Sequence, residues 1–397
     1  MKSIIIGNGI NLQFSNKTYS NEFILKRAYL NSLTGIYTKY FNNTIQQKEL
    51  EDMFKDFVKV AKLIFDDNLQ HLNEELKLEI IEFKKRYPNK IKKYDEIIME
   101  DWFLILHYVI EKNNDIKSQW SACEIGLKII FLSAIYNNGQ IEKIFENIPK
   151  NVVEYINGFD KIFTLNFDMN LDGIVKNDVY HLHGSFANLS KSKPDKIGFK
   201  EFSECNTILN YSGSRKLNSI DNMQMKKEYH FEKIEHLTGE VTIIGMSPNN
   251  DNHIFESINK SMIQKVFFYT YGNLNIQLPL TKEYKILNVK KLWGKLKVNK
   301  NEYRNQIYNK ILTNKNQIIK FQKDLEPLLL EKDNIERVLK DVKLLDDSEI
   351  KRLVGRVENN INKESMDKEG IISIALEEGV LPTTLYFLYF EYRKNVK

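Results

Sequence analysis

Cysteine and proline are scarce in this chain. Its 397 residues include two cysteines, Cys123 and Cys205, and seven prolines. Two cysteines far apart in the sequence cannot form a disulfide framework or a four-cysteine zinc site. We therefore expect no structural zinc and a reducing, intracellular setting. The prolines are too dispersed to mark a linker between domains.

Long apolar runs and a large excess of one charge are also missing. No stretch approaches the ~18 uninterrupted apolar residues of a membrane span, and no charged and apolar leader precedes the first expected strand. The net charge of +5 is small against 58 basic and 53 acidic side chains, and the basic residues are scattered. These features predict a cytoplasmic protein without membrane contact and do not indicate nucleic-acid binding.

Apolar and aromatic residues are plentiful. Hydrophobic residues make up 42% of the chain, with 23 Phe and 20 Tyr, which is enough for packed cores. Between residues 50 and 64, apolar positions recur at the three-and-four spacing of one helix face. The runs "DWFLILHYVIE" and "GLKIIFLSAIY" are apolar almost all round, which is typical of buried helices. Residues 20 to 155 are therefore expected to form a helical layer.

The pattern then changes to short apolar runs that end in turn residues. These runs are "KIFTLNFD", "DVYHLHG", "EVTIIGMSPNND", "KVFFYTYGN" and "EYKILNV". Strands alternating with helices predict an α/β fold with a doubly wound, mostly parallel, Rossmann-like sheet. Residues 1–299 would form this domain, with 20–155 inserted after the first strand. Residues 300–397 are expected to be mostly helical, with a possible short strand at "LYFLYF".

The opening segment "SIIIGNGINLQF" contains a two-glycine turn after a strand. The spacing of Gly7 and Gly9 matches the start of the dinucleotide fingerprint, in which glycine permits a sharp turn and a close approach of the backbone. The third glycine of that fingerprint is missing, and Leu12 stands where a small residue is expected. By itself this segment is more often a tight turn than a nucleotide site.

Four strand ends carry polar residues that could bind a ligand. In open α/β sheets, ligands bind beyond the carboxyl ends of the strands. The residues found there are Gly7, Asn8, Gly9 and Asn11, then Thr164, Asn166 and Asp168, then His181, His183 and Gly184, and finally Gly245, Ser247 and Asp251.

The order G-N-G-x-N, T-x-N-F-D, H-G and G-x-S-x-x-x-D resembles the sirtuin fold. It resembles more closely the bacterial sirtuin-like domains that degrade NAD in antiphage defence, over residues 1–15 and 155–290. Protein-deacylating sirtuins carry a four-cysteine zinc module after the histidine-glycine pair, whereas residues 185–225 of this chain hold only Cys205. The missing module favours NAD hydrolysis over deacylation, with NAD as the substrate and no zinc. Asn8 stands where sirtuins usually carry alanine, which is a further resemblance to the bacterial antiphage domains.

The resemblance implies a role for each of these residues. Asn166 would hold the ribose or the attacking water, His183 would act as general base, and Asp168 would orient the nicotinamide side. The remaining residues are expected to bind the nucleotide: Gly7, Asn8 and Gly9 at the pyrophosphate, Ser247 and Asp251 at the adenosine ribose, and Asn11, Thr164 and Gly245 within the same motifs.

Simpler interpretations exist for several of these residues. Asn166 and Asp168 could close a turn after a strand. His181 competes with His183 for the role of base. Ser247 or Asp251 could cap the helix that follows them.

The expected function is an NAD hydrolase that acts as an antiphage effector by depleting NAD. A protein deacylase and a non-catalytic nucleotide sensor or scaffold are the alternatives. Because a free NAD hydrolase would be toxic, we expect a homo-oligomer or docking on a partner ATPase, such as a HerA-like translocase, or on another phage sensor. The segments "NIERVLKDVKLL" and "VLPTTLYFLYFEY" would form that interface, or else pack on the chain's own sheet domain.

Overall fold

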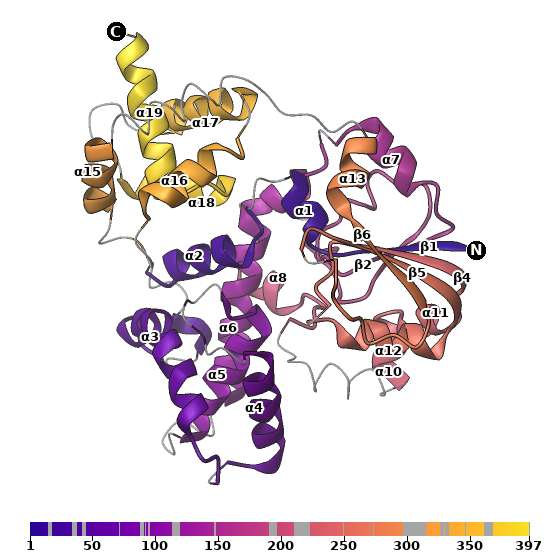
Figure 1. Ribbon diagram of the computed structural model, residues 1–397. Helices are drawn as coiled ribbons and strands as arrows, with labels where there is room; N and C mark the ends of the chain where they lie inside the picture. Colours follow the sequence, from indigo (N-terminus) through magenta and orange to yellow (C-terminus); the bar gives the residue numbers. More distant parts are fainter. Residues whose placement is uncertain are drawn as a thin grey trace.

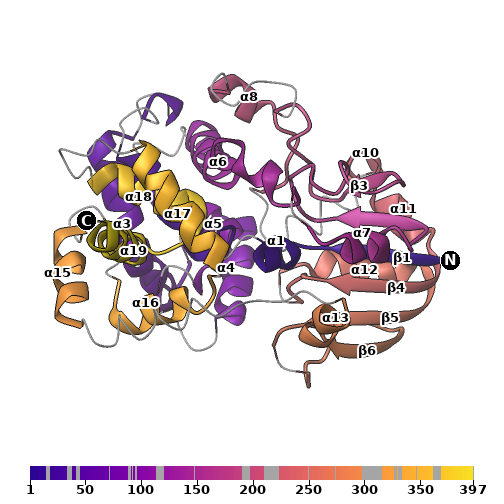
Figure 2. The ribbon, with the colours of Figure 1, turned by 90° about the horizontal axis from the view of Figure 1, so that it is seen from above.

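The computed structural model combines one parallel sheet with two groups of helices (Figures 1 and 2). It describes residues 1–14, 18–33, 38–41, 45–70, 72–87, 91, 93, 96–112, 120–146, 148–189, 197–209, 223–248, 250–272, 274–296, 315–325, 329, 333–345, 347–360 and 368–396. In Figure 1 the sheet and its flanking helices lie on one side, and the helical layer and the C-terminal helices lie on the other.

Six strands form the sheet, in the order β3-β2-β1-β4-β5-β6, and every pair is parallel. Their bounds are β1 (Lys2–Ile6), β2 (Lys161–Thr164), β3 (Val179–His181), β4 (Thr238–Ile244), β5 (Met262–Thr270) and β6 (Glu283–Asn288). The chain moves outward from β1 through β2 to β3, then returns to the other side of β1 for β4. This confirms the predicted α/β fold with a parallel, Rossmann-like sheet, and it places a topological switch point between β1 and β4.

Alternation along β1 explains why both faces of the sheet are covered. Ile4 and Ile6 pack into one hydrophobic cluster, and Ile5 packs into another on the opposite face. The first face carries α7 (Lys150–Ile156) and α13 (Val289–Lys295), and the second carries α10 (Met223–Glu228), α11 (Phe231–Glu235) and α12 (Asn252–Lys260) (Figure 1).

The chain between β1 and β2 forms mainly helices. They are α1 (Gly9–Phe14), α2 (Asn21–Ser32), η1 (Thr38–Phe41), α3 (Gln47–Asp66), α4 (Glu74–Arg86), α5 (Met99–Lys112), α6 (Trp120–Tyr136), η4 (Asn137–Lys143) and α7. The two runs that are apolar all round are α5 and α6, and both are mostly buried. Trp102 of α5 stacks on Phe57 of α3 with ring centroids 3.8 Å apart. The helix α8 (Phe199–Ser203) packs against α6 from beyond β3.

The C-terminal helices form a separate hydrophobic cluster. They are α15 (Lys315–Leu325), α16 (Ile335–Val342), α17 (Asp347–Asn360), α18 (Lys368–Glu378) and α19 (Pro382–Val396). The cluster also contains Phe23 of α2 and, among the described residues, none from the sheet, so these helices pack on the helical layer.

The expectation of a short strand at "LYFLYF" is wrong, because this segment lies inside α19. Pro382 opens the helix, a position that suits proline because its fixed φ is helical and the first N–H has no partner in the helix. Leu385 to Tyr389 are all buried. A short apolar run cannot be told from a buried helix by periodicity alone.

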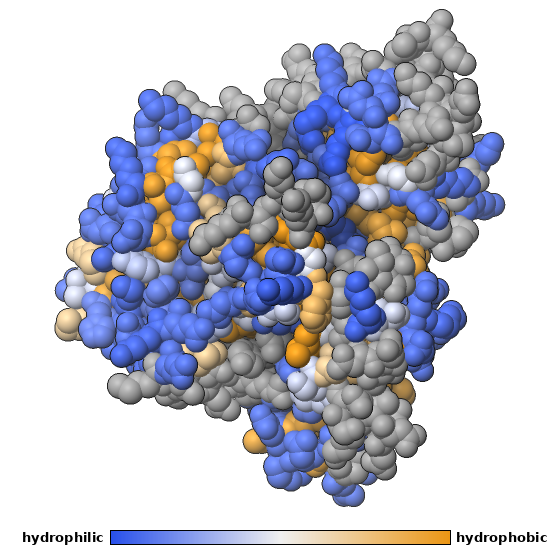
Figure 3. All heavy atoms as spheres, turned by 180° about the vertical axis from the view of Figure 1, so that it is seen from behind, coloured by the Kyte–Doolittle hydropathy of each residue, from blue (hydrophilic) through white to orange (hydrophobic). Residues whose placement is uncertain are grey.

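The surface seen from behind is mainly hydrophilic. Among the described residues visible there, the hydrophobic ones gather in a few separate areas (Figure 3). Within the described ranges, no single helix is both long and apolar enough to cross a membrane. Only α18 and the first part of α19 reach that composition together, and they are bent by 111°.

Candidate active site

A cavity of about 490 Å³ lies at the carboxyl edge of the sheet. The strand register aligns the ends of four strands, because Ile6 pairs with Thr164 and Ile244, and Thr164 pairs with His181. The residues that follow these ends therefore meet at one edge. The helical layer supplies further walls through residues such as Tyr19, Ile24, Met99 and Ile135. The volume is within the ~300–1,000 Å³ typical of small-molecule sites.

Nearly all the residues singled out from the sequence line this cavity: Gly7, Asn8, Gly9, Asn11, Asn166, Asp168, His183, Gly245, Ser247 and Asp251. His181 and Gly184 do not line it, and neither does Thr164. Its buried hydroxyl donates to the carbonyl of Ile6 at 3.2 Å and accepts from the backbone N–H of Asn166 at 3.1 Å. Thr164 therefore ties the turn after β2 to β1 and does not form part of the cavity wall.

Three glycines that follow the ends of β1 and β4 pack backbone to backbone at the switch point. A Cβ on Gly7 would lie 2.6 Å from the carbonyl oxygen of Gly245, and a Cβ on Gly9 would lie 2.5 Å from the Cα of Gly245. Gly245 itself has a φ of +75°, which favours glycine. It takes the close-packing role of the third glycine that the N-terminal motif lacks. The N–H groups of Gly7 and Gly9 donate to the carbonyls of Ile244 and Gly245, so both serve this packing.

Asn166 is held in the turn after β2 and faces the cavity. Its backbone N–H is bound by Thr164, and its carbonyl accepts from the ring of His181 at 3.0 Å. Its side-chain oxygen is buried and has no hydrogen-bond partner among the described residues. An unpaired buried acceptor costs free energy unless a ligand or water satisfies it. The side chain of Asn166 is thus available to a bound molecule.

Asp168 is the centre of a buried hydrogen-bond network. Its carboxylate accepts from the side-chain amide of Asn11 at 2.7 Å and from the side chain and backbone of Asn170 at 2.7 and 3.2 Å. Burial raises the pKa of Asp168, and these hydrogen bonds oppose that rise. The network joins the start of α1 to the turn after β2, so Asp168 helps to shape the cavity as well as lining it.

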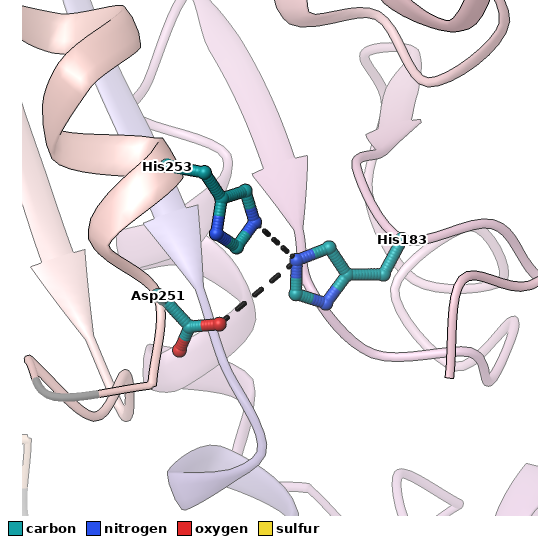
Figure 4. A group of neighbouring side chains, drawn as sticks. All are labelled: His183, Asp251 and His253. Carbon is teal, nitrogen blue, oxygen red and sulfur yellow. Dashed lines mark hydrogen bonds and ion pairs between the residues drawn. The ribbon is translucent and has the colours of Figure 1, made fainter. Parts of the chain in front are cut away.

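His183, Asp251 and His253 come together beside the cavity (Figure 4). The Nε2 atoms of His183 and His253 are 2.8 Å apart, and Oδ1 of Asp251 is 3.9 Å from the same His183 nitrogen. All three residues are buried. Asp251 occupies the N-cap position of α12, but its side chain makes no capping hydrogen bond. The capping interpretation of Asp251 is therefore wrong, since its carboxylate faces His183.

His181 is held away from the cavity wall. Its Nδ1 lies 3.0 Å from the carbonyl of Asn166, and its Nε2 lies 3.0 Å from a carboxylate oxygen of Asp172. Both partners are acceptors, which favours the doubly protonated ring. Burial opposes protonation of His181, but the contacts with Asp172 and Asn166 raise its pKa overall. His181 therefore braces the turn of Asn166, and the cavity-lining histidine is His183.

Two residues of this region were missed by the sequence interpretation. His253 lies two residues after Asp251 in "NDNHIF". The sequence pattern there predicts only the start of a helix and does not indicate a role for this histidine. Glu142 of η4 accepts from the backbone N–H of Met169 at 2.8 Å, next to Asp168. Burial and the charge of Asp168 raise the pKa of Glu142 to about 7. No sequence signal marks Glu142, because its neighbours come from a distant part of the chain.

Acidic side chains dominate the charge of the cavity. Glu96, Glu100, Asp168 and Asp251 line it, and no lysine or arginine does so among the described residues. Such a lining suits a positively charged group, for which carboxylates are favourable neighbours. Among the described residues, the lining offers no lysine or arginine that could form an ion pair with a phosphate group.

A metal ion could find ligands at one place within the described ranges. His183, Asp251 and His253 offer ligand atoms that all lie within 4.8 Å of one another. Two imidazoles and a carboxylate are ligands that zinc, iron and manganese accept. The cysteines take no part in this group, since Cys123 and Cys205 are buried elsewhere and are free thiols.

Comparisons of the chain with protein-family models, with curated proteins and with solved structures found no match. A function must therefore be supported by the residues of the cavity, because a Rossmann-like sheet alone hosts many activities.

Proposed function

We propose that this protein is a sirtuin-type NAD hydrolase that cleaves NAD to nicotinamide and ADP-ribose and acts as an antiphage effector in the cytoplasm by depleting NAD. One observation carries the proposal. The side-chain oxygen of Asn166 is buried without a partner in a cavity at the switch point, where His183 lines the same wall. A site of this kind presents a polar group and a base to one small molecule, at the place where Rossmann-like sheets bind nucleotides.

The reaction needs positioning more than a strong nucleophile. The bond between the ribose C1′ and the nicotinamide nitrogen breaks through an oxocarbenium-like state, and its electron pair leaves with nicotinamide. Water adds to C1′, and its proton passes to His183. The amide of Asn166 orients the ribose or this water. His183 is the better candidate for the base because it lines the cavity, whereas His181 is bound between Asn166 and Asp172.

The acidic lining supports binding of the nicotinamide end. The nicotinamide ring of NAD carries a positive charge, and Asp168 and Asp251 would stabilise it. We also revise the expected role of Asp251. Because this carboxylate lies 3.9 Å from His183 Nε2, we assign it to the same ribose as His183 and not to the adenosine ribose.

The nucleotide end of NAD would lie over the glycines. The N–H groups of Gly7 and Gly9 are used inside the protein, so these residues contribute a close-packed floor and not hydrogen bonds to the pyrophosphate. Asn8 is exposed at the rim, and its side-chain amide donates to the carbonyl of Tyr19 at 2.7 Å. Ser247, also exposed at the rim, offers a hydroxyl to the phosphates or the adenosine ribose.

The activity can be tested directly. Purified protein is incubated with NAD, with and without an acylated peptide, and the nucleotides are identified by mass spectrometry. Nicotinamide and ADP-ribose without peptide support the hydrolase. Products that require the peptide would identify a deacylase instead. Tight NAD binding without turnover, measured by calorimetry, would identify a sensor or scaffold.

An effector of this kind needs a resting state that does not consume NAD. We propose that assembly into a homo-oligomer, or onto a partner ATPase such as a HerA-like translocase or another phage sensor, controls the activity. The buried part of α19 is not available for that contact, because Leu385 to Tyr389 pack inside the C-terminal cluster. The contact would instead use exposed faces of the helices.

A further inference from the structure

Three consecutive residues where α6 passes into η4 have left-handed backbone conformations. The φ angles are +50° at Asn137, +51° at Asn138 and +80° at Gly139. Asparagine enters this region more readily than most residues, but its Cβ still crowds the backbone there. A run of such residues persists only where the surrounding structure holds it. The contacts on the two sides of this turn therefore decide its shape.

One side of the turn is bound to the end of α18. The buried side-chain amide of Asn137 donates to the carbonyl of Glu377 at 2.8 Å. The neighbouring carbonyl of Leu376 accepts from Arg27 at 2.7 Å, and the same guanidinium donates to the carbonyl of Ala134 in α6, also at 2.7 Å. The C-terminal helices thus fix both the end of α6 and the turn that follows it.

The other side of the turn is bound to the segment after β2. The carbonyl of Ile141 accepts from the side-chain amide of Asn170 at 2.7 Å, and the carboxylate of Glu142 accepts from the backbone N–H of Met169 at 2.8 Å. The Asn170 amide also donates to Asp168 at 2.7 Å. η4 therefore holds the segment whose hydrogen bonds shape the cavity.

We propose that the turn at residues 137–139 is a positioning element that transmits the docking of the C-terminal helices to residues 166–170 of the cavity. This inference concerns the regulation of the proposed active site and rests on the proposed function. While Glu377 accepts from Asn137, the left-handed turn is held and η4 supports the cavity segment. When α18 shifts, Asn137 loses its acceptor and the turn relaxes toward right-handed conformations, which draws η4 away from Met169 and Asn170.

Such a turn has the properties that regulation requires. It has two discrete arrangements, and contacts at both ends favour one of them. A partner that binds the exposed faces of the C-terminal helices and moves α18 would change the cavity without entering it.

The first test removes the contact with α18 without straining the turn. In Asn137→Gly the new residue adopts a φ of +50° readily, but the amide that donates to Glu377 is lost. Hydrogen exchange of the Met169 amide, measured without NAD, should become about tenfold faster, because the segment opens more often. kcat/KM for NAD should fall about tenfold, since a misplaced reactive group lowers the rate.

The matched control is Asn177→Gly. The side-chain amide of Asn177 also donates to a backbone carbonyl, that of Phe159, at 2.8 Å. Asn177 precedes β3 and Phe159 precedes β2, so this bond lies at the opposite edge of the sheet. Asn177→Gly should leave the exchange of Met169 and kcat/KM unchanged, and its melting temperature should match that of Asn137→Gly.

A second pair of variants changes the backbone preference alone. Asn138 is exposed, so a replacement there loses no packing. Asn138→Val should speed exchange at Met169, because a β-branched residue strongly disfavours positive φ. Asn138→Gly should keep slow exchange, since glycine accepts the turn. Should Asn137→Gly fail to fold, this pair decides the question alone.

The exchange measurement separates this inference from the proposed function. Faster exchange at Met169 in Asn137→Gly or Asn138→Val, in a protein that does not cleave NAD, would support the coupling and count against NAD hydrolysis alone. Unchanged exchange in Asn137→Gly, or an equal increase in Asn177→Gly, would overturn the inference. NAD cleavage at the wild-type rate despite faster exchange would also overturn it.

Discussion

Asn11 donates a hydrogen bond of 2.7 Å to Asp168, and both side chains are buried. Asn11 belongs to α1 just after β1, and Asp168 belongs to the turn after β2, so the bond joins two segments that the whole helical layer separates in sequence. The segment that carries Asn166 is fixed in place by this contact and by Asn170.

We expect Asp168→Asn to lose stability and activity together. The carboxylate accepts hydrogen bonds from three N–H groups of Asn11 and Asn170. The amide NH₂ of an asparagine is itself a donor, so it would face some of these N–H groups without forming a hydrogen bond. An unsatisfied buried group costs about 1–3 kcal/mol of unfolding free energy, which urea denaturation can measure. Asp172→Asn is the control, since the Asp172 side chain is 30% exposed and its carboxylate contacts only the ring of His181 among the contacts described above. Full stability in Asp168→Asn would show that the network does not shape the site.

Asn166→Ala and His183→Ala should each abolish NAD cleavage while the protein stays folded. Loss of a positioned general base typically costs ~100 to 10,000-fold in rate. NAD turnover and circular dichroism are measured together, with the exposed Asn68→Ala and His236→Ala as matched controls. Wild-type turnover in both site variants would mean that the cavity is not the active site.

Asp251→Asn should reduce kcat/KM without lowering the melting temperature. Its side chain makes no capping bond to α12, so the helix does not depend on it. Hydrogen bonds to charged groups contribute about 1.5–3 kcal/mol, which corresponds to roughly 10- to 100-fold in kcat/KM. Steady-state kinetics and thermal unfolding test this. A lower melting temperature with unchanged kinetics would mean that Asp251 stabilises the fold and takes no part in the reaction.

We expect the purified protein to contain no zinc and to be indifferent to chelators. Cys123 and Cys205 are buried separately, and burial raises the pKa of each thiol to about 11, which opposes the thiolate form that binds zinc. Elemental analysis and thermal unfolding with a chelator measure this. Stoichiometric zinc with unfolding on chelation would revive the deacylase alternative.

The sequence predicted the edge of the sheet better than the contacts made there. Apolar runs that end in turn residues located the strands, and topology then brought Gly7, Asn166 and His183 to one cavity. The partner of the glycine turn could not be predicted, since Gly245 follows β4, far along the chain. His253 was missed because helical periodicity says nothing about which distant ring a side chain meets. The aromatic run of α19 was ambiguous because strands and buried helices share that composition.

The C-terminal helices are expected to be needed for folding of the helical layer. Arg27 of α2 is buried and donates to the carbonyls of Thr18, Ala134 and Leu376, the last of which lies in α18. Burial lowers the pKa of Arg27 to about 10, so these acceptors are its main compensation for lost hydration. Truncation after residue 300 would remove Leu376 and expose Phe23. We expect an insoluble product, and a folded monomer would instead support a role of this region in assembly.

Gly379→Ala tests the same contact in the full-length chain. Gly379 has a φ of +68°, and a Cβ there would lie 2.2 Å from the backbone nitrogen of Thr18. We expect a loss of about 2–4 kcal/mol of unfolding free energy from the left-handed backbone and the overlap together. The control is Gly355→Ala in α17, where a Cβ meets nothing within 4 Å, so helix propensity should stabilise it by up to about 1 kcal/mol. Because Thr18 precedes Tyr19, whose carbonyl holds Asn8 at the cavity rim, Gly379→Ala should also weaken NAD binding. Unchanged stability in Gly379→Ala would show that the C-terminal helices do not pack closely against the segment around Thr18.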